Sequence, residues 1–341
     1  MGTRTGRVVA GGIAVASAVG LGLLAVPGGA GAAPELPPVS AQDLVASVIK
    51  ADPGPFNGTV TLDNQLGLPA LPNLPQAANG TSTARIWSGG DGKGRVQIPT
   101  ATGERTLVAD GTTVWSWDST DRTVTTGPEK HDGARPEAGP TDPTAAATQA
   151  LAALTPTSTI AVDGTAEVAG RPAYALVLAP KPTERTLLRE VRIAVDAEKR
   201  VPLQLTVLAQ GSSTPVLTVG FSDVSFAAPD PSLFTFTPPA GATVKQEPAK
   251  PEGQPDGQRP AKPAGAAAPA VVGDGWDTVV VAKAPQGANL GQVSALGKPV
   301  SGAWGSGHEI DTAVATAIVT DDGRIAAGAV PEQVLTEALQ K

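Results

Sequence analysis

The chain has 341 residues and a formal net charge of −7, with 2 His, no Cys and 11 aromatic residues (5 Trp, 5 Phe and 1 Tyr). The absence of cysteine excludes disulfides, thiolate metal sites and a lipid-modified N-terminal cysteine. The acidic balance argues against nucleic-acid binding, which needs clustered Lys and Arg. The length allows two domains.

The first 32 residues have the pattern of a secretory signal peptide. Arg4 and Arg7 precede an uncharged apolar run from Val8 to Val26, and Ala30-Gly31-Ala32 supplies an A-x-A cleavage site. The alternative is an uncleaved N-terminal anchor, since 19 apolar residues could just span a bilayer. We therefore expect a secreted or extracytoplasmic protein that is not lipid-anchored.

The first half of the chain predicts one helix and then a series of strands. Ser40 and Asp43 form an N-cap pattern before a short amphipathic helix at about 41–51. From there apolar residues alternate, and the Asp110-Gly111 pair predicts a tight hairpin of type I′. A loop is expected at 67–80, which holds three Pro and three Leu. The expected strands are 57–66, 82–88, 94–98, 104–109, 112–117 and 121–126.

A second helix is predicted from Asp142 to Leu154, because Asp is a good N-cap and Pro143 fits the first helical turn. Further strands follow at 158–168, 172–180, 187–196, 201–209, 215–226 and 233–236. Eleven or so antiparallel strands interrupted by two helices predict a mainly β fold with helices (α+β), built as a large curved sheet or open barrel.

Residues 245–272 are rich in Pro and Ala and predict a semi-extended linker. The linker would join a first domain at 40–244 to a small α+β C-terminal domain at 273–341. Within the latter we expect strands at 276–282, 311–320 and 325–330, a strand or loop at 302–306, and helices at 287–296 and 331–341.

No motif predicts catalysis. His131 and His308 each stand in polar loop sequence without a partner motif, and the glycines at 89–94 lie between two strands, where a hairpin turn is expected instead of a phosphate cradle. Asp321-Asp322-Gly323 could suggest a calcium site, but an EF-hand loop needs oxygen ligands across twelve residues. We therefore interpret these residues as a turn. We expect no enzyme activity, no cofactor and no metal.

Apolar residues repeatedly share one face of the predicted strands. Such a face is either a plain packed core or, in part, an unfilled groove that accepts an acyl chain, and both readings stay open. The candidate cavity-lining residues are Val60, Leu62, Trp87, Trp115, Trp117, Leu176, Leu178 and Leu205.

Two segments resemble the LolA-like superfamily. Residues 107–118 (LVADGTTVWSWD) resemble its "xDGxxxW" hairpin, and residues 233–244 (LFTFTPPAGATV) resemble its closing "F-x-F-x-P-P-x-G" segment. The resemblance covers roughly residues 40–244. It implies a half-open antiparallel β-barrel with a helical lid over a hydrophobic cavity that holds acyl chains without turning them over. Members of LppX/LprG type carry a lipidated Cys that this chain lacks, and the two-domain layout is closest to RseB-type regulators.

We therefore expect an exported, non-catalytic protein that binds lipid or lipoprotein acyl chains. The alternative is an extracytoplasmic sensor or scaffold that regulates a membrane signalling partner, such as an anti-sigma factor, through its C-terminal domain.

Overall fold

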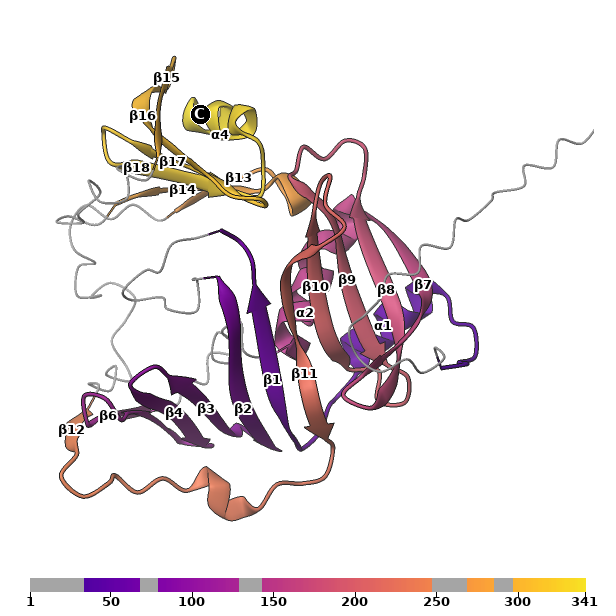
Figure 1. Cartoon of the computed structure of the whole chain (residues 1–341), viewed down its shortest axis with the longest axis vertical. Coiled ribbons are helices and arrows are strands. Elements are labelled where there is room, and N and C mark those ends of the chain that lie inside the picture. The colour runs from indigo at the N-terminus through magenta and orange to yellow at the C-terminus, as the bar shows by residue number, and fades with distance from the viewer. Residues whose placement is uncertain (1–33, 68–78, 129–142, 247–268, 285–296) are drawn as a thin grey trace, which may run out of the picture. The chain divides into compact units, whose positions relative to one another are not determined.

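The computed structural model describes residues 34–67, 79–128, 143–246, 269–284 and 297–341 (Figure 1). Residues 34–246 contribute two α-helices, α1 (Ala41–Lys50) and α2 (Pro143–Leu154), and one large sheet. The strands of this sheet are β1 (Phe56–Asn64), β2 (Gly80–Gly90), β3 (Lys93–Thr100), β4 (Gly103–Asp110), β5 (Thr113–Asp118), β6 (Thr123–Pro128), β7 (Ser158–Val168), β8 (Arg171–Pro180), β9 (Leu188–Asp196), β10 (Pro202–Ala209), β11 (Pro215–Ser225) and β12 (Thr243–Gln246).

The large sheet has 12 strands in the order β12-β6-β5-β4-β3-β2-β1-β11-β10-β9-β8-β7. Neighbours are antiparallel, except that β12 runs parallel to β6. Near the middle of the sheet β1 pairs with β11, so a late strand of the series lies beside the first one. The sheet is not closed into a barrel, which confirms the predicted open, mainly β fold with few helices.

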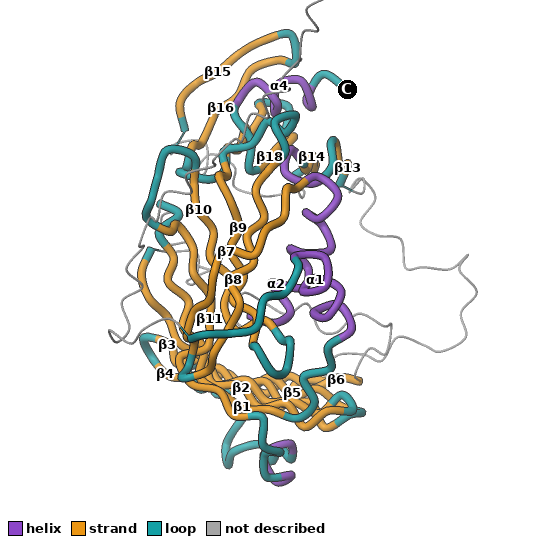
Figure 2. Tube along the Cα trace, turned by 90° about the vertical axis from the view of Figure 1, so that its right-hand side faces the viewer, coloured by secondary structure: helices purple, strands orange, loops and turns teal. Residues whose placement is uncertain are grey.

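Both helices lie on one face of the large sheet (Figure 2). Leu44, Val45 and Val48 of α1 pack in one core with Ala147 and Leu151 of α2 and with the strands beneath them. The predicted N-cap is confirmed, because Ser40 Oγ accepts the Asp43 amide at 3.1 Å. No helix within the described ranges is long and apolar enough to cross a membrane.

Several local predictions need correction. The predicted strand at 233–236 is wrong: Asp230 caps a 3₁₀ helix, η3 (Pro231–Phe234), because its side chain accepts the Ser232 amide and Pro231 begins the turn. At the Asp110-Gly111 hairpin only Gly111 has a positive φ (+96°), which fits a type II′ turn and not type I′. The strand β12 was not predicted at all.

Residues 270–283 and 298–328 form a second sheet of six strands, in the order β13-β14-β18-β17-β16-β15. One face is covered by the C-terminal helix α4 (Glu332–Leu339), whose Val334 and Leu335 pack on Val279 and Ile318. The strands are β13 (Ala270–Val272), β14 (Val279–Lys283), β15 (Lys298–Gly302), β16 (Gly305–Asp311), β17 (Thr316–Thr320) and β18 (Arg324–Gly328).

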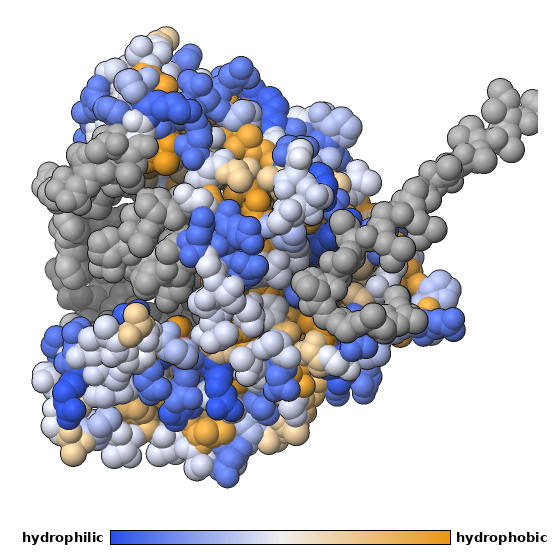
Figure 3. Space-filling model, in the orientation of Figure 1, coloured by the Kyte–Doolittle hydropathy of each residue, from blue (hydrophilic) through white to orange (hydrophobic). Residues whose placement is uncertain are grey.

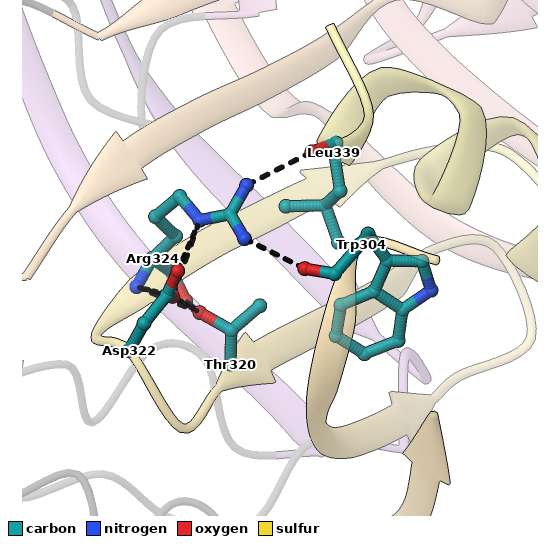
Figure 4. A network of polar contacts seen from close by, with 5 residues as sticks. All are labelled: Trp304, Thr320, Asp322, Arg324 and Leu339. Carbon is teal, nitrogen blue, oxygen red and sulfur yellow. Dashed lines mark hydrogen bonds and ion pairs between the residues drawn. The ribbon is translucent and has the colours of Figure 1, made fainter. Parts of the chain in front are cut away.

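The predicted turn at 321–324 is confirmed and is fixed by Arg324 (Figure 4). The guanidinium donates to the Leu339 carbonyl of α4 and to the Trp304 carbonyl of the β15–β16 turn, both at 2.9 Å, and Nε pairs with Asp322. One cation therefore holds two turns and the last helix together. A calcium role for Asp321 and Asp322 has no support here, because Asp322 already pairs with Arg324.

Some expectations differ in extent or fall outside the described residues. The strand expected at 311–320 is shorter than predicted: Asp311 ends β16, a turn follows at Thr312, and β17 begins at Thr316. Residues 302–306 include the turn between β15 and β16. β13 and β15 were not predicted. The 67–80 loop, the 287–296 helix and most of the 245–272 linker lie outside the described residues, so the domain boundaries remain predictions.

Candidate functional site: an apolar strip on the inner face

The register of the large sheet sorts its side chains into two faces. We call the face that carries α1 and α2 the inner face and the opposite one the outer face. Across antiparallel strands, directly paired residues point to the same side. Val60 pairs with Ala84 and Phe221, which places all three on the inner face, and the pairing continues outward from there in both directions.

Five of the eight candidate lining residues lie on the inner face, in the core beneath the helices. They are all buried, with 6% exposure or less: Val60, Leu62, Leu176, Leu178 and Leu205. Pairings of Leu62 with Val219, Leu205 with Val219, and Leu176 with Ile193 run across the sheet without a gap. The space in front of these side chains is therefore filled by other residues of the protein. They could line a cavity only if the helices moved.

The three tryptophans lie on the other face. Trp87 pairs with Arg95, Arg95 with Val108, and Val108 with Trp115, while the inner-facing Ile86 is the neighbour of Trp87 in β2. Trp117 follows the same outward alternation. The structure thus separates the eight candidates into an inner group of five and an outer group of three.

The chain between β11 and β12, residues 226–242, crosses the outer face; we call it the closing segment. The Phe236 ring lies 5.7 Å from that of Trp115, and Arg95 donates to the Leu233 carbonyl at 3.3 Å. A Cβ placed on Gly89 would meet the buried Phe234 ring at 2.7 Å, so this segment sits directly on the β2–β3 hairpin.

As a consequence, the face of the sheet whose side chains are buried differs between the strands near α1 and α2 and the strands under the closing segment. In β1 and β2 the inner side chains are buried, whereas in β4 and β6 the outer ones are, namely Thr106, Val108, Val124 and Thr126. Leu107, on the inner face of β4, is 38% exposed. Its inner-facing neighbours include further apolar residues that are only partly buried. We call this set the inner strip: Val96, Ile98, Leu107, Ala109 and Val114.

The inner strip is continuous with the helix-covered core. Val96 pairs with the buried Ile86 on one side and with Leu107 on the other, and it packs against the core cluster under α1. An apolar chain on Leu107 would therefore have an unbroken hydrophobic path toward the core.

An ion pair closes one end of the strip. There Arg105 pairs with Asp118 at 3.2 Å. Burial raises the pKa of Asp118, but hydrogen bonds from Arg105 and from the Thr120 and Asp121 amides outweigh it and lower the pKa overall. In the β4–β5 hairpin the Thr113 amide, with the Thr112 hydroxyl and amide, lowers the pKa of Asp110, which the register places on the outer face. Both carboxylates stay ionised near neutral pH, and Asp118 marks the limit of the apolar surface at its end of the strip.

A small hollow lies between the β2–β3 hairpin and the closing segment. It is lined by Pro55, Gly89, Lys93, Ala228, Pro229, Pro231 and Phe234 and holds about 170 Å³. That is below the ~300 Å³ at which small-molecule sites usually begin. It is the less suitable place for an acyl chain.

The loop expected at His308 is wrong, because His308 lies within β16, paired with Pro299 and Val319. His131 falls outside the described residues. Within the described ranges no group of three His, Asp or Glu side chains could hold a metal ion.

Exposed apolar side chains come to the surface in separate patches on the face shown in Figure 3, with hydrophilic residues between them. The large exposed ones among the described residues are Ile49, Leu107, Val244, Val271 and Val280. Sequence reasoning missed Leu107 as a site residue, because Leu107, Val108 and Ala109 form a consecutive apolar run that does not reveal which member faces inward.

Comparisons with known proteins found no matching family model and no matching curated protein sequence. Solved structures do match. The MucA/MucB complex of Pseudomonas aeruginosa matches with 18% identity and a TM-score of 0.49, over 88% of this chain and 96% of that one. A LolA superfamily protein from Nitrosomonas europaea matches with 14% identity and a TM-score of 0.27, over 58% and 99%. A putative outer membrane lipoprotein-sorting protein domain from Vibrio parahaemolyticus matches with 12% identity and a TM-score of 0.21, over 54% and 89%. These chains share less than 20% of their residues with this one, so the similarity concerns the fold alone.

Proposed function

We propose that this protein binds the acyl chains of a lipid or lipoprotein on the inner strip, without chemical turnover. The observation that carries the proposal is the exposure of Leu107 beside a fully packed core. Each methylene group of a ligand that is buried there contributes about 0.8 kcal/mol, so a chain contacting the strip needs no polar recognition to bind.

The helix α2 is suited to yield to such a ligand. Its sequence, PTAAATQALAAL, contains no charged residue, and it has neither an acidic residue in its first turn nor a basic one in its last. The side chains that it buries are mostly small, namely Pro143, Ala145, Ala147 and Leu151. Small side chains remove little apolar surface from water, so α2 is held less firmly than a Leu-rich helix would be.

The expected export signal lies in residues 1–32, outside the described residues, and it would place the protein in the cell envelope, where membrane lipids and lipoproteins are present. The structural neighbours include a lipoprotein-sorting domain and the protein MucB in complex with MucA. These names describe the neighbours, and the proposal for this chain depends on the inner strip.

Native mass spectrometry of the exported protein from its own host, together with uptake of a fluorescent fatty acid, tests the proposal. We expect a co-purifying lipid, and we expect Leu107→Asp to weaken fatty-acid binding about tenfold, equivalent to ~1.4 kcal/mol. Val280→Asp is the matched control, because it places the same charge at another exposed apolar position, on β14. Absence of both lipid and uptake in the unsubstituted protein would overturn the proposal.

A second candidate function is regulation of a membrane partner through the six-stranded sheet. Val271 and Val280 are cross-strand partners on the face opposite α4, and they are 65% and 41% exposed. A pair of exposed valines favours contact with another protein surface. If this function applies, Val280→Asp abolishes retention of the protein on host membranes, whereas Leu107→Asp does not. The two variants thus give opposite results for the two functions.

A further inference from the structure

Trp276 connects the six-stranded sheet to the core of the large sheet. It lies in the short 3₁₀ helix η4 (Gly275–Asp277), just before β14, and its side chain is 2% exposed. The indole packs in the core of the large sheet, together with residues of α1 and α2. Val279, three positions later, lies in the separate core beneath α4. The chain therefore passes from one hydrophobic core to the other within one turn.

A relay of two hydrogen bonds connects the indole to the end of α2. Trp276 Nε1 donates to Ser158 Oγ at 2.8 Å, and Ser158 Oγ donates to the carbonyl of Leu154, the last residue of α2, at 2.6 Å. Ser158 is buried, so this relay is shielded from water. Charge-free hydrogen bonds of this kind contribute most when their loss leaves a buried group unsatisfied.

The backbone next to Trp276 is fitted closely to the same place. Gly275 has a φ of +58°, and a Cβ there would lie 2.0 Å from Thr157 Oγ1. Only glycine permits both the conformation and the approach. The segment that carries the indole thus packs against residues 157 and 158, which follow shortly after the end of α2.

The other contacts between the two sheets are more peripheral. The Leu187 amide and the Thr186 hydroxyl both donate to the Ala329 carbonyl, at 2.9 and 2.7 Å. Arg185 and Glu337 form an ion pair whose side chains are half exposed, and such pairs contribute little. Val314 packs with Ala209 and Val216 in a small apolar cluster. Trp276 reaches furthest into the core of the larger sheet.

We infer that Trp276 couples α2 to the six-stranded sheet, so that displacement of α2 by a bound acyl chain shifts the position of that sheet. This inference rests on the proposed function, because the ligand is what would move α2. It gives the C-terminal sheet a defined role, which is to report occupancy of the inner face. A buried indole is an effective coupling element because a packed core has discrete arrangements and does not deform continuously.

The absence of cysteine in the chain makes the test direct. Ala153→Cys at the exposed end of α2 and Gln333→Cys on the exposed side of α4 give two spin-label sites whose separation can be measured by pulsed electron paramagnetic resonance. With otherwise unsubstituted protein, adding palmitate should shift the distance distribution. With Trp276→Ala the shift should disappear while fatty-acid uptake persists. Val108→Ala, a cavity in β4 far from the relay, serves as the control for general destabilisation and should retain the shift.

The outcomes separate the two proposals. Uptake without a distance change in the unsubstituted protein, or a shift that persists in Trp276→Ala, overturns the coupling and leaves the proposed function intact. Absence of uptake overturns the proposed function and with it any ligand-driven movement. Amide hydrogen exchange then tests the connection between the two cores without any ligand. Trp276→Ala should accelerate exchange about tenfold at both 151–158 and 279–283. Acceleration confined to 275–278 would contradict the coupling.

Discussion

The rings of Trp115 and Phe236 lie 5.7 Å apart with their planes tilted by 34°, and this contact joins β5 to the closing segment. An aromatic pair in contact adds about 0.5–1.5 kcal/mol beyond its buried area. The contact helps to hold the closing segment over the outer side chains of β4 and β6, on a face where no α-helix lies among the described residues. The closing segment takes the place of a helical layer there, whereas Leu107, on the inner face of β4, stays 38% exposed.

Truncation of the closing segment's buried anchor should therefore destabilise this half of the sheet. Phe234→Ala removes a ring that is 5% exposed and packs on Gly89. We expect a loss of about 3 kcal/mol in the free energy of unfolding, as for other buried Phe residues. Urea unfolding measures the loss. Val244→Ala, at a side chain that is 49% exposed, should change stability by less than about 0.5 kcal/mol. Equal effects of the two changes would argue against the segment as a cover.

The change of buried face within one strand gives a second prediction. Leu107 and Val108 are adjacent, yet one is 38% and the other 1% exposed. Val108→Ala should cost about 1–2 kcal/mol because it opens a cavity under the closing segment, whereas Leu107→Ala should cost less than about 0.5 kcal/mol. Chemical denaturation of the two variants under identical conditions compares them. A larger loss for the Leu107 variant would mean that β4 faces the other way.

Sequence patterns predict much of this fold because the relevant signals are local. The alternation at Val60 and Leu62, or at Leu176 and Leu178, fixes strand and inward face together, since one side of these strands is packed. The Ser40 cap and the Pro143 helix start are similarly local. For these elements the structure agrees with the prediction to within a few residues.

The site was less predictable because it depends on what covers each face. Trp115 and Trp117 alternate as inward residues would, and nothing in β5 itself indicates that the closing segment covers them from the outside. Phe234 and Phe236 also alternate like a strand, but the Asp230-Pro231 pair begins a 3₁₀ turn there. Trp276 reads as the start of a strand, and its place in a distant core follows only from the tertiary structure.

Acid should weaken the large sheet through Asp196. This carboxylate is fully buried, beside Arg171 and the amides of Glu198 and Lys199. Burial raises its pKa, but the hydrogen bonds from Arg171 and the Lys199 and Glu198 amides outweigh burial and lower it below 3.8. A lowered pKa stabilises the fold above the unfolded-state value, and that contribution is lost as the pH falls through the folded-state value.

Asp196→Asn should consequently cost about 3 kcal/mol or more at pH 7, because it leaves Arg171 without its buried partner. The cost should be smaller at pH 3, which lies below the ordinary value of 3.8, because the unfolded chain then already binds the proton. Urea unfolding at both pH values measures the difference. Glu198→Gln is the matched control, since Glu198 pairs with the same Arg171 but its side chain is 74% exposed. Its cost should stay below about 1 kcal/mol. A cost for Asp196→Asn that does not depend on pH would contradict this assignment.

The six-stranded sheet should respond to pH in the opposite direction, through Glu309. Burial raises the pKa of Glu309 to about 6, and the charges of Asp311 on β16 and Glu332 on α4 add to the effect. Lys298 lies across from it on β15 and opposes the rise, but its ammonium pairs with Asp311 at 3.0 Å. Because the folded-state pKa exceeds the ordinary value of 4.5, the folded state binds the proton more tightly. Stability is then greatest below about 4.5 and falls as the pH rises to about 6.

Glu309→Gln should remove that fall, because the amide is neutral at every pH and retains the size of the carboxyl group. Urea titrations between pH 4.5 and 7, followed through the NMR signal of the buried Ile318 methyl groups, report on this sheet by itself. We expect the unsubstituted protein to lose stability across the interval and the variant to be more stable than it at pH 7. Glu167→Gln, at an exposed position in β7, should leave the slope unchanged. A slope that survives in Glu309→Gln would place the titrating group elsewhere, with Asp311 and Glu332 as the next carboxyl groups to replace.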